Sequence, residues 1–180
     1  MVNQIQPEAR TCYSELQTER LQAPRVLPSV LSGADVIVEQ KEAPGAMSDH
    51  EAIQEVFKVT YGKPRVEFVA SDQPRADQPL KVGVVLSGGQ APGGHNVIAG
   101  IYDGIKKCSP TSVMVGFLGG PGGIMKGNYC VIDDAMMDKY RNTGGFDMIA
   151  SGRDKIESPE QFAQSLATIN ELGEFKCTLK

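Results

Sequence analysis

The sequence predicts an α/β protein with a parallel, doubly wound sheet, preceded by an irregular, partly helical N-terminal extension. Residues 80–86, 112–118 and 146–150 are short and mainly apolar, as expected of strands that are covered on both faces. Residues 95–107 between the first two runs have an apolar pattern of helical period, which completes a βαβ unit. Because such crossovers make the two strands parallel, their carboxyl ends and the loops that follow should meet at one edge.

Residues 80–100 contain the first strand, a glycine-rich turn and a helix start. The strand should end at Leu86, and Gly88 and Gly89 then allow a tight turn that brings bare backbone close to a ligand. The expected buried face of the helix consists of Val97, Ile98, Ile101, Tyr102 and Ile105. A helix N-terminus beside a glycine turn favours anions, so we predict an anion-binding turn, with a purely structural strand-to-helix corner as the alternative.

Two common phosphate motifs are excluded. A Walker A loop needs Lys and Ser or Thr directly after its last glycine, whereas His95 and Asn96 follow Gly94. The dinucleotide fingerprint needs glycine two residues after its first glycine, whereas Gln90 stands two residues after Gly88.

The remaining stretches continue the α/β pattern. Residues 119–127 contain five glycines and form either a second ligand-lining loop or a flexible connector, two alternatives that the sequence leaves open. Residues 129–132 suggest a short antiparallel strand and residues 133–140 a short helix. Ser158 and Gln161 predict a capping box, with Gly173 as the helix end. Its expected buried stripe is Phe162, Leu166, Ile169 and Leu172.

The N-terminal extension, residues 1–79, is expected to have limited structure and to serve packing or subunit contact. Residues 11–21 could form a short helix, and Ser48 with Glu51 suggests a capping box before a second helix. The apolar face of that helix would contain Ile53, Val56 and Phe57. Residues 65–70 suggest an edge strand, and 71–79 a linker before a domain formed by 80–180.

Composition limits the classes of function. The 180 residues carry a net charge of −4 with a pI near 5.2, which gives no reason to expect nucleic acid or an anionic membrane as a partner. No apolar run reaches the roughly 20 residues of a membrane helix, and the first ten residues lack an apolar signal core. We therefore expect a cytoplasmic protein. The four cysteines are widely spaced, so we expect reduced thiols and no zinc site.

Arg153, Asp154 and Lys155 come directly after the third predicted strand, at the edge where the glycine turn should open. The planar guanidinium group of an arginine suits phosphate oxygens. The alternative is a surface cluster in which these charges satisfy one another, and the residues by themselves favour this alternative, because exposed charges are usually solvated.

Four segments carry a resemblance to a known family: SELQTERLQAPRVLP, VGVVLSGGQAPGGHNVIAGI, GFLGGPGGIMKG and YRNTGGFDMIASGRDKIESPEQF. From about Ser14 onward, the chain resembles the pyrophosphate-dependent phosphofructokinases of the long plant and protist type. The resemblance implies a phosphofructokinase-like fold and reversible phosphoryl transfer, with Mg²⁺, between pyrophosphate and the 1-hydroxyl of fructose 6-phosphate. It also implies that Gly88, Gly89 and Arg153 bind the pyrophosphate.

The sequence departs from the family in lacking its Gly-Gly-Asp-Asp turn, which carries the metal ligand, and its Thr-Ile-Asp-Gly-Asp segment, which carries the catalytic aspartate. We therefore expect the amino-terminal part of the catalytic domain, with no catalytic residue and no metal ligand, inactive alone and marginally stable. Its sheet should have about three parallel strands and an open edge. When full length it should form a homo- or hetero-oligomer.

Two other readings remain. One is a non-catalytic regulatory or phosphate-binding subunit of the same lineage, and the other is an unrelated α/β phosphate-binding module.

Overall fold

The computed structural model describes residues 1–5, 14–24, 26–74, 76–173 and 177–179. The chain divides into two compact units: unit 1 contains Met1–Pro24 and Asp77–Lys180, and unit 2 contains Arg25–Ala76. The boundary after Ala76 lies inside the predicted linker, and the first 24 residues of the predicted extension belong to unit 1. Among the described helices, none is both long enough and apolar enough to cross a membrane.

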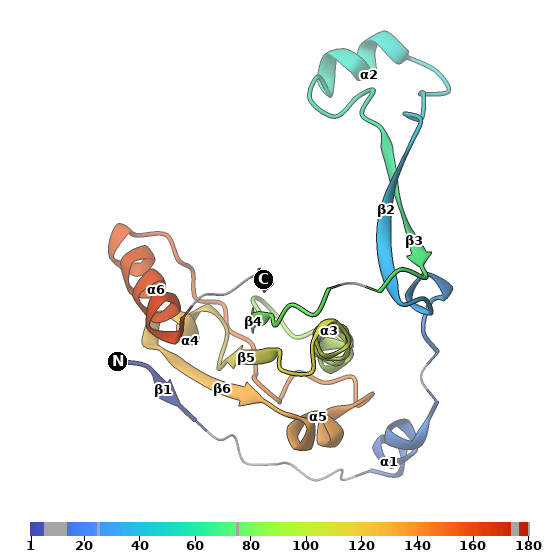
Figure 1. Cartoon of the computed structure of the whole chain (residues 1–180). Helices are drawn as coiled ribbons and strands as arrows, with labels where there is room; N and C mark the ends of the chain where they lie inside the picture. The colour runs from blue at the N-terminus through green and yellow to red at the C-terminus, as the bar shows by residue number, and fades with distance from the viewer. Residues whose placement is uncertain (6–13, 25, 75, 174–176, 180) are drawn as a thin grey trace. The chain divides into compact units, whose positions relative to one another are not determined.

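Unit 1 is built on a five-stranded sheet of order β1-β6-β5-β4-β7 (Figure 1). The strands are β1 Asn3–Gln4, β4 Lys81–Val84, β5 Val113–Phe117, β6 Asn128–Ile132 and β7 Cys177–Leu179. β4 pairs in parallel with β5 and with β7, and β1 pairs in parallel with β6. β5 and β6 are antiparallel, which confirms the short antiparallel strand predicted near residues 129–132.

Helices cover both faces of this sheet, which confirms the doubly wound α/β fold class. On one face, α3 (Gly94–Cys108) and α5 (Asp134–Tyr140) enclose a core with Val82, Val84 and Met114. On the other face, a smaller core around Phe117 includes Ile124 of α4 (Pro121–Lys126) and is packed against Leu172 of α6 (Pro159–Leu172).

The predicted strand at 146–150 is wrong. Met148 and Ile149 are 1% exposed, as a core segment should be, but these residues join no strand ladder. Residues 147–149 form a turn instead, and the φ angle of Ala150, 56°, lies outside the extended region. A third strand of the parallel set is β7, which pairs with β4.

Two predicted helix faces also need correction. α6 begins with the predicted capping box of Ser158 and Gln161 and ends before Gly173. However, Phe162 and Leu166 are 58% and 57% exposed, and the buried side chains are instead those of Ser165 and Thr168. The reason is that α6 contacts the short helix α4, and small side chains permit a close approach. In α3, Val97 is likewise exposed rather than buried.

The helix predicted at 11–21 corresponds to α1 (Glu15–Gln22), which belongs to unit 1 and is capped by Ser14. Residues 11–13 lie outside the described residues. Nδ2 of Asn142 donates to the carbonyl oxygen of Arg20 at 2.8 Å, and thus ties the end of α1 to the loop after α5.

Unit 2 is a β-hairpin with a helix inserted between its strands (Figure 1). β2 (Asp35–Lys41) and β3 (Arg65–Ser71) pair antiparallel, α2 spans His50–Val56, and a 3₁₀ turn, η1, spans Ser29–Leu31. β3 confirms the predicted strand at 65–70, whereas its partner β2 was not predicted. The capping box predicted before α2 is wrong, because the N-cap is Asp49 in a left-handed conformation and makes no side-chain cap bond.

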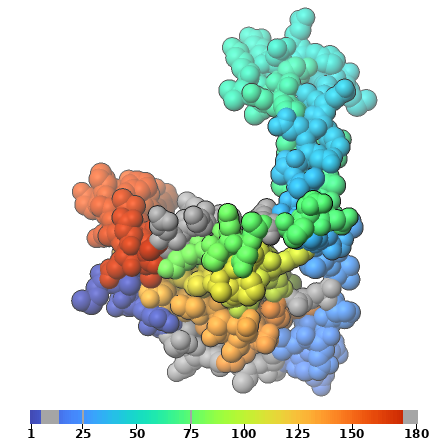
Figure 2. All heavy atoms as spheres, viewed as in Figure 1, coloured from blue at the N-terminus to red at the C-terminus, as the bar shows by residue number. Residues whose placement is uncertain are grey.

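One face of the β2–β3 ribbon is apolar and exposed. Val38 and Phe68 stand opposite each other and are 58% and 67% exposed. Figure 2 shows the atoms of this ribbon in blue and green. The apolar residues expected on one face of α2 are exposed as well, since Val56 is 74% exposed and Phe57, at the helix end, 56%. Unit 2 therefore holds its shape mainly through its strand ladder.

Candidate functional site

The candidate site lies where β4 and β5 end and residues 149–152 pass between the segments that follow them. The N–H of Gly119, after β5, donates to the carbonyl of Ile149 at 2.8 Å. On the other side, Gly152 donates to the carbonyl of Leu86 at 3.3 Å and accepts the N–H of Gly88 at 2.8 Å. Ser87 and Gly152 form an isolated parallel bridge. The glycine turn and the Arg153 segment are therefore held together by backbone hydrogen bonds.

Gly89 and Arg153, which the sequence separates by 64 positions, are neighbours in the structure. A Cβ placed on Gly89 would lie 3.3 Å from Nη2 of Arg153. Gly88 has a φ of 103°, and a Cβ there would meet nothing within 4 Å, so the space above this glycine is open. The structure thus brings the three predicted pyrophosphate-binding residues, Gly88, Gly89 and Arg153, to one edge of the sheet.

The charges after Arg153 do not form one self-satisfied cluster. Lys155 pairs with Glu157 at 3.1 Å, whereas the Asp154 carboxylate lies against the start of α4, where a Cβ on Gly122 would meet Oδ2 at 2.7 Å. Among the carboxylates of the described residues, none forms an ion pair with Arg153, and this side chain is exposed. Its guanidinium group is therefore accessible to an anion.

The glycines of residues 119–123 serve close packing. A Cβ at Gly120 would lie 2.4 Å from the backbone N of Gly152, and a Cβ at Gly152 would lie 2.1 Å from the carbonyl oxygen of Gly119. Both backbones can approach so closely only because neither residue has a side chain. Of the two alternatives for residues 119–127, the flexible connector is wrong, since Pro121–Lys126 form α4 and four of the six residues are buried. The ligand-lining alternative stays a prediction.

The N-terminus of α3 is partly engaged by the loop after α5. The N–H of Gly93 donates to the carbonyl of Gly144 at 2.8 Å, and that of His95 donates to Gly145 at 2.9 Å. A Cβ on Gly94 would lie 2.8 Å from the ring of Phe146. The open part of the predicted anion-binding turn is therefore at Gly88 and Gly89, several residues before the helix.

His95 lies behind this contact and is 1% exposed. The Met148 N–H donates to Nε2 at 3.0 Å, so Nε2 carries the lone pair and the proton of the neutral ring is on Nδ1. Nδ1 then donates to Oγ1 of Thr143 at 2.6 Å, and that hydroxyl donates to the carbonyl of Tyr140 at 2.8 Å. Burial lowers the pKa of His95, and Asp147, with Oδ1 3.3 Å from Nε2, only partly offsets this effect.

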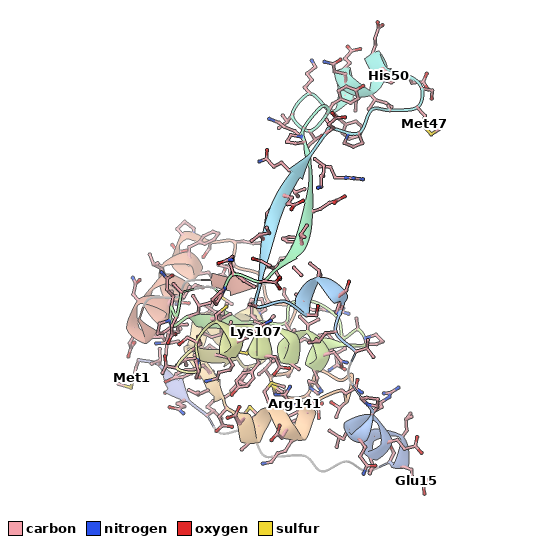
Figure 3. The ribbon with its side chains drawn as sticks, turned by 45° about the vertical axis from the view of Figure 1, so that its right-hand side comes forward. Met1, Glu15, Met47, His50, Lys107 and Arg141 are labelled. Atoms are coloured by element: carbon pink, nitrogen blue, oxygen red, sulfur yellow. The ribbon has the colours of Figure 1, made fainter. Side chains whose placement is uncertain are left out.

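Other titratable groups in unit 1 have structural partners. Arg141, labelled in Figure 3, donates two hydrogen bonds to the carboxylate of Asp103 on α3, at 2.9 and 3.0 Å. Tyr102 donates to Asp134 at 2.8 Å, and burial raises its pKa. Burial raises the pKa of the Cys130 thiol to about 11. Sequence reasoning missed His95 and Arg141 as anchors because their partners lie 38 to 53 positions away.

The described residues can also be examined for metal ligands. They include no group of three or more His, Cys, Asp or Glu side chains that could hold a metal ion.

The chain is similar over most of its length to several phosphotransferases. It is 50% identical over 163 residues to the pyrophosphate–fructose 6-phosphate 1-phosphotransferase subunit beta of Solanum tuberosum, and the match covers 89% of this chain and 28% of that protein. The chain is homologous to one segment of these phosphotransferases. The resemblance inferred from the motifs is confirmed. The phosphotransferase of Treponema pallidum is 44% identical over 171 residues, and the subunit alpha of Solanum tuberosum is 34% identical over 168.

The chain spans less than a third of the length of these phosphotransferases, between 27% and 30%. No family model matches it. Among solved structures, the T-state phosphofructokinase of Pichia pastoris matches 61% of this chain and 13% of its own, with a TM-score of 0.42 and 20% identity.

Proposed function

We propose that the chain supplies the pyrophosphate-binding edge of a pyrophosphate-dependent 6-phosphofructokinase. The reaction is the reversible transfer of phosphoryl between pyrophosphate and the 1-hydroxyl of fructose 6-phosphate. The observation that carries the proposal is the 50% identity, across 89% of the chain, to a phosphotransferase subunit whose name states these substrates. The position of Arg153 beside Gly89 supports it, because it places an exposed guanidinium group at a bare turn.

The two kinds of residue have different roles in binding. Arg153 provides parallel donors that match two oxygens of a phosphate, and a charge-assisted hydrogen bond contributes about 1.5–3 kcal/mol. Gly88 and Gly89 let the phosphate come close to the backbone, because neither residue has a Cβ atom in the way. The N–H of Gly88 is engaged with Gly152, so it does not act as a donor to the ligand.

Magnesium belongs to the proposed reaction, where it would neutralise charge on the pyrophosphate oxygens. The described residues do not fit a magnesium site, as they lack a cluster of suitable ligands, and we derive no step through the metal. No described residue is assigned as the base. The proposal includes a cytoplasmic location and a homo- or hetero-oligomeric assembly, the latter supported by the alpha and beta subunit names of two relatives.

The proposal is tested by titrating pyrophosphate into the chain by calorimetry. Arg153→Ala should weaken binding about tenfold or more, since it removes charge-assisted hydrogen bonds. Lys155→Ala is the matched control: it removes an equal charge two positions away, from a side chain paired with Glu157, and should change affinity less than twofold. Equal effects of both variants would show that only net charge matters, and no binding by the wild-type chain would contradict the proposal.

Gly89→Ala tests the geometry of the same site. The added methyl would lie 3.3 Å from Nη2 of Arg153, which can give way because it ends a flexible side chain. We expect normal folding and weaker pyrophosphate binding. Gly100→Ala in α3 is the control, since a Cβ there meets nothing within 4 Å and alanine favours a helix. Unchanged affinity in Gly89→Ala would remove Gly89 from the site.

A further inference from the structure

We propose that His95 is a positioning residue that fixes the start of the segment carrying Arg153, which backbone hydrogen bonds then hold against the glycine turn. The inference rests on the proposed function, because it concerns the same site. The ring joins the start of α3 to residues 143–148 through both of its nitrogens, and the backbone from Met148 leads directly to Arg153.

The segment before Arg153 needs an anchor. Gly144 and Gly145 are consecutive, and Asn142 and Ala150 have left-handed φ angles of 54° and 56°, which non-glycine residues seldom adopt. Such a backbone keeps one conformation only when its surroundings impose it. His95 is buried among these residues, and a Cβ on Gly145 would lie 3.0 Å from its ring.

His95 imposes that conformation from both sides of its ring. Nδ1 bonds to Thr143, before the two glycines, and Nε2 accepts the N–H of Met148, after them. The ring also contacts Tyr140 edge-on, with centroids 4.8 Å apart. His95 thus spans the flexible glycine pair and fixes both of its flanks to α3.

From Met148 the restraint passes along a short path. Ile149 accepts the Gly119 N–H, Gly152 pairs with Leu86 and Gly88, and Arg153 follows next to Gly89. The steps from Ile149 to Gly152 are backbone hydrogen bonds, and Arg153 then reaches Gly89 through its side chain. Release of Met148 therefore shifts the backbone that carries the guanidinium group. No contact between His95 and a ligand is needed.

The test compares His95→Phe with Tyr102→Phe. Phenylalanine keeps a ring beside Tyr140 but loses both hydrogen bonds of His95. Tyr102 lies on the same helix, is 2% exposed and loses one hydrogen bond, to Asp134 on α5, so it controls for general loss of stability. The readouts are the NMR resonances of the Gly152 amide and the Arg153 Nε–H, and the pyrophosphate affinity.

In His95→Phe we expect the Gly152 and Arg153 resonances to shift or broaden while those of β4 and β5 stay in place, and pyrophosphate to bind about tenfold more weakly. The side chain of His95→Gln can still donate and accept hydrogen bonds, so this variant should recover part of the wild-type resonance positions and part of the pyrophosphate affinity. Tyr102→Phe should change neither.

Unchanged Gly152 and Arg153 resonances in a folded His95→Phe chain would overturn the inference. If that variant unfolds, Thr143→Val provides the same comparison, because it removes the acceptor of Nδ1 at a partly exposed position. If the wild-type chain fails to bind pyrophosphate, the proposed function fails, whereas the resonances still decide whether His95 positions Arg153.

Discussion

At the residue scale, the neutral state of His95 couples the folding of unit 1 to pH. Its Nε2 must keep a lone pair to accept the Met148 N–H, and protonation would place a charge in a site that is 1% exposed. Both effects lower the pKa of His95. The unfolded chain therefore binds a proton at this residue at higher pH than the folded chain does.

We predict that the free energy of unfolding falls as pH drops below about 6.5, the ordinary histidine pKa, and continues to fall until the lowered pKa of the folded state is reached. Urea titrations at pH 7.5, 6.5 and 5.5 measure this slope. His95→Phe should lose it over that range. The lowered pKa values of Glu160 and Glu171 produce no slope there, since ordinary carboxyl groups titrate near pH 4. A wild-type chain as stable at pH 5.5 as at 7.5 would contradict the prediction.

At the element scale, α6 shows how a helix can form as predicted and yet bury a different face. Its capping box and C-terminal glycine fix its ends, and Lys81 donates to the carbonyl of Leu172 near its last turn. Its contact with α4 places Ser165 and Thr168 inside and leaves Phe162 and Leu166 exposed. The exposed pair is four positions apart and thus lies on one side of the helix.

We predict that Phe162→Gln changes the free energy of unfolding by less than about 0.5 kcal/mol, because the side chain is 58% exposed. Ile124→Ala, on the facing helix α4, should lower it by about 2–5 kcal/mol, because Ile124 is 6% exposed and part of the core around Phe117. Denaturant titration of both variants measures the difference. A large loss in Phe162→Gln would mean that Phe162 is covered in solution.

At the scale of the whole molecule, the two units differ in how their strands are supported. The sheet of unit 1 has five strands with helices on both faces, whereas the ribbon of unit 2 has two strands, and Val38 and Phe68 on one of its faces are largely exposed. A two-stranded hairpin is at best marginally stable in water, because each strand has only one neighbour.

We therefore predict that backbone amides of β2 and β3 exchange with solvent much faster than those of β4 and β5. Hydrogen–deuterium exchange followed by mass spectrometry resolves the two regions in one experiment. Equal protection in the two sheets would indicate that the apolar face of the ribbon is covered by a partner surface in solution.

The sequence by itself determined the local elements and the relatives. A few neighbouring residues encode the caps of α5 and α6 and the apolar run of β4. The reason is that capping and backbone preference act over one or two turns. The motifs around Gly88 and Arg153 also identified the phosphotransferase resemblance, which the comparisons confirm.

Tertiary structure alone decided which groups meet. Local pattern could not show that the carbonyls of Gly144 and Gly145 would accept the N–H groups of Gly93 and His95, nor that residues 146–150 would not form a strand. It also could not place Arg153 beside Gly89 or direct His95 inward. These outcomes depend on pairings between segments about 50 or more positions apart, and a hydrogen bond or a close glycine contact is specified by both partners, whereas a sequence pattern describes one at a time.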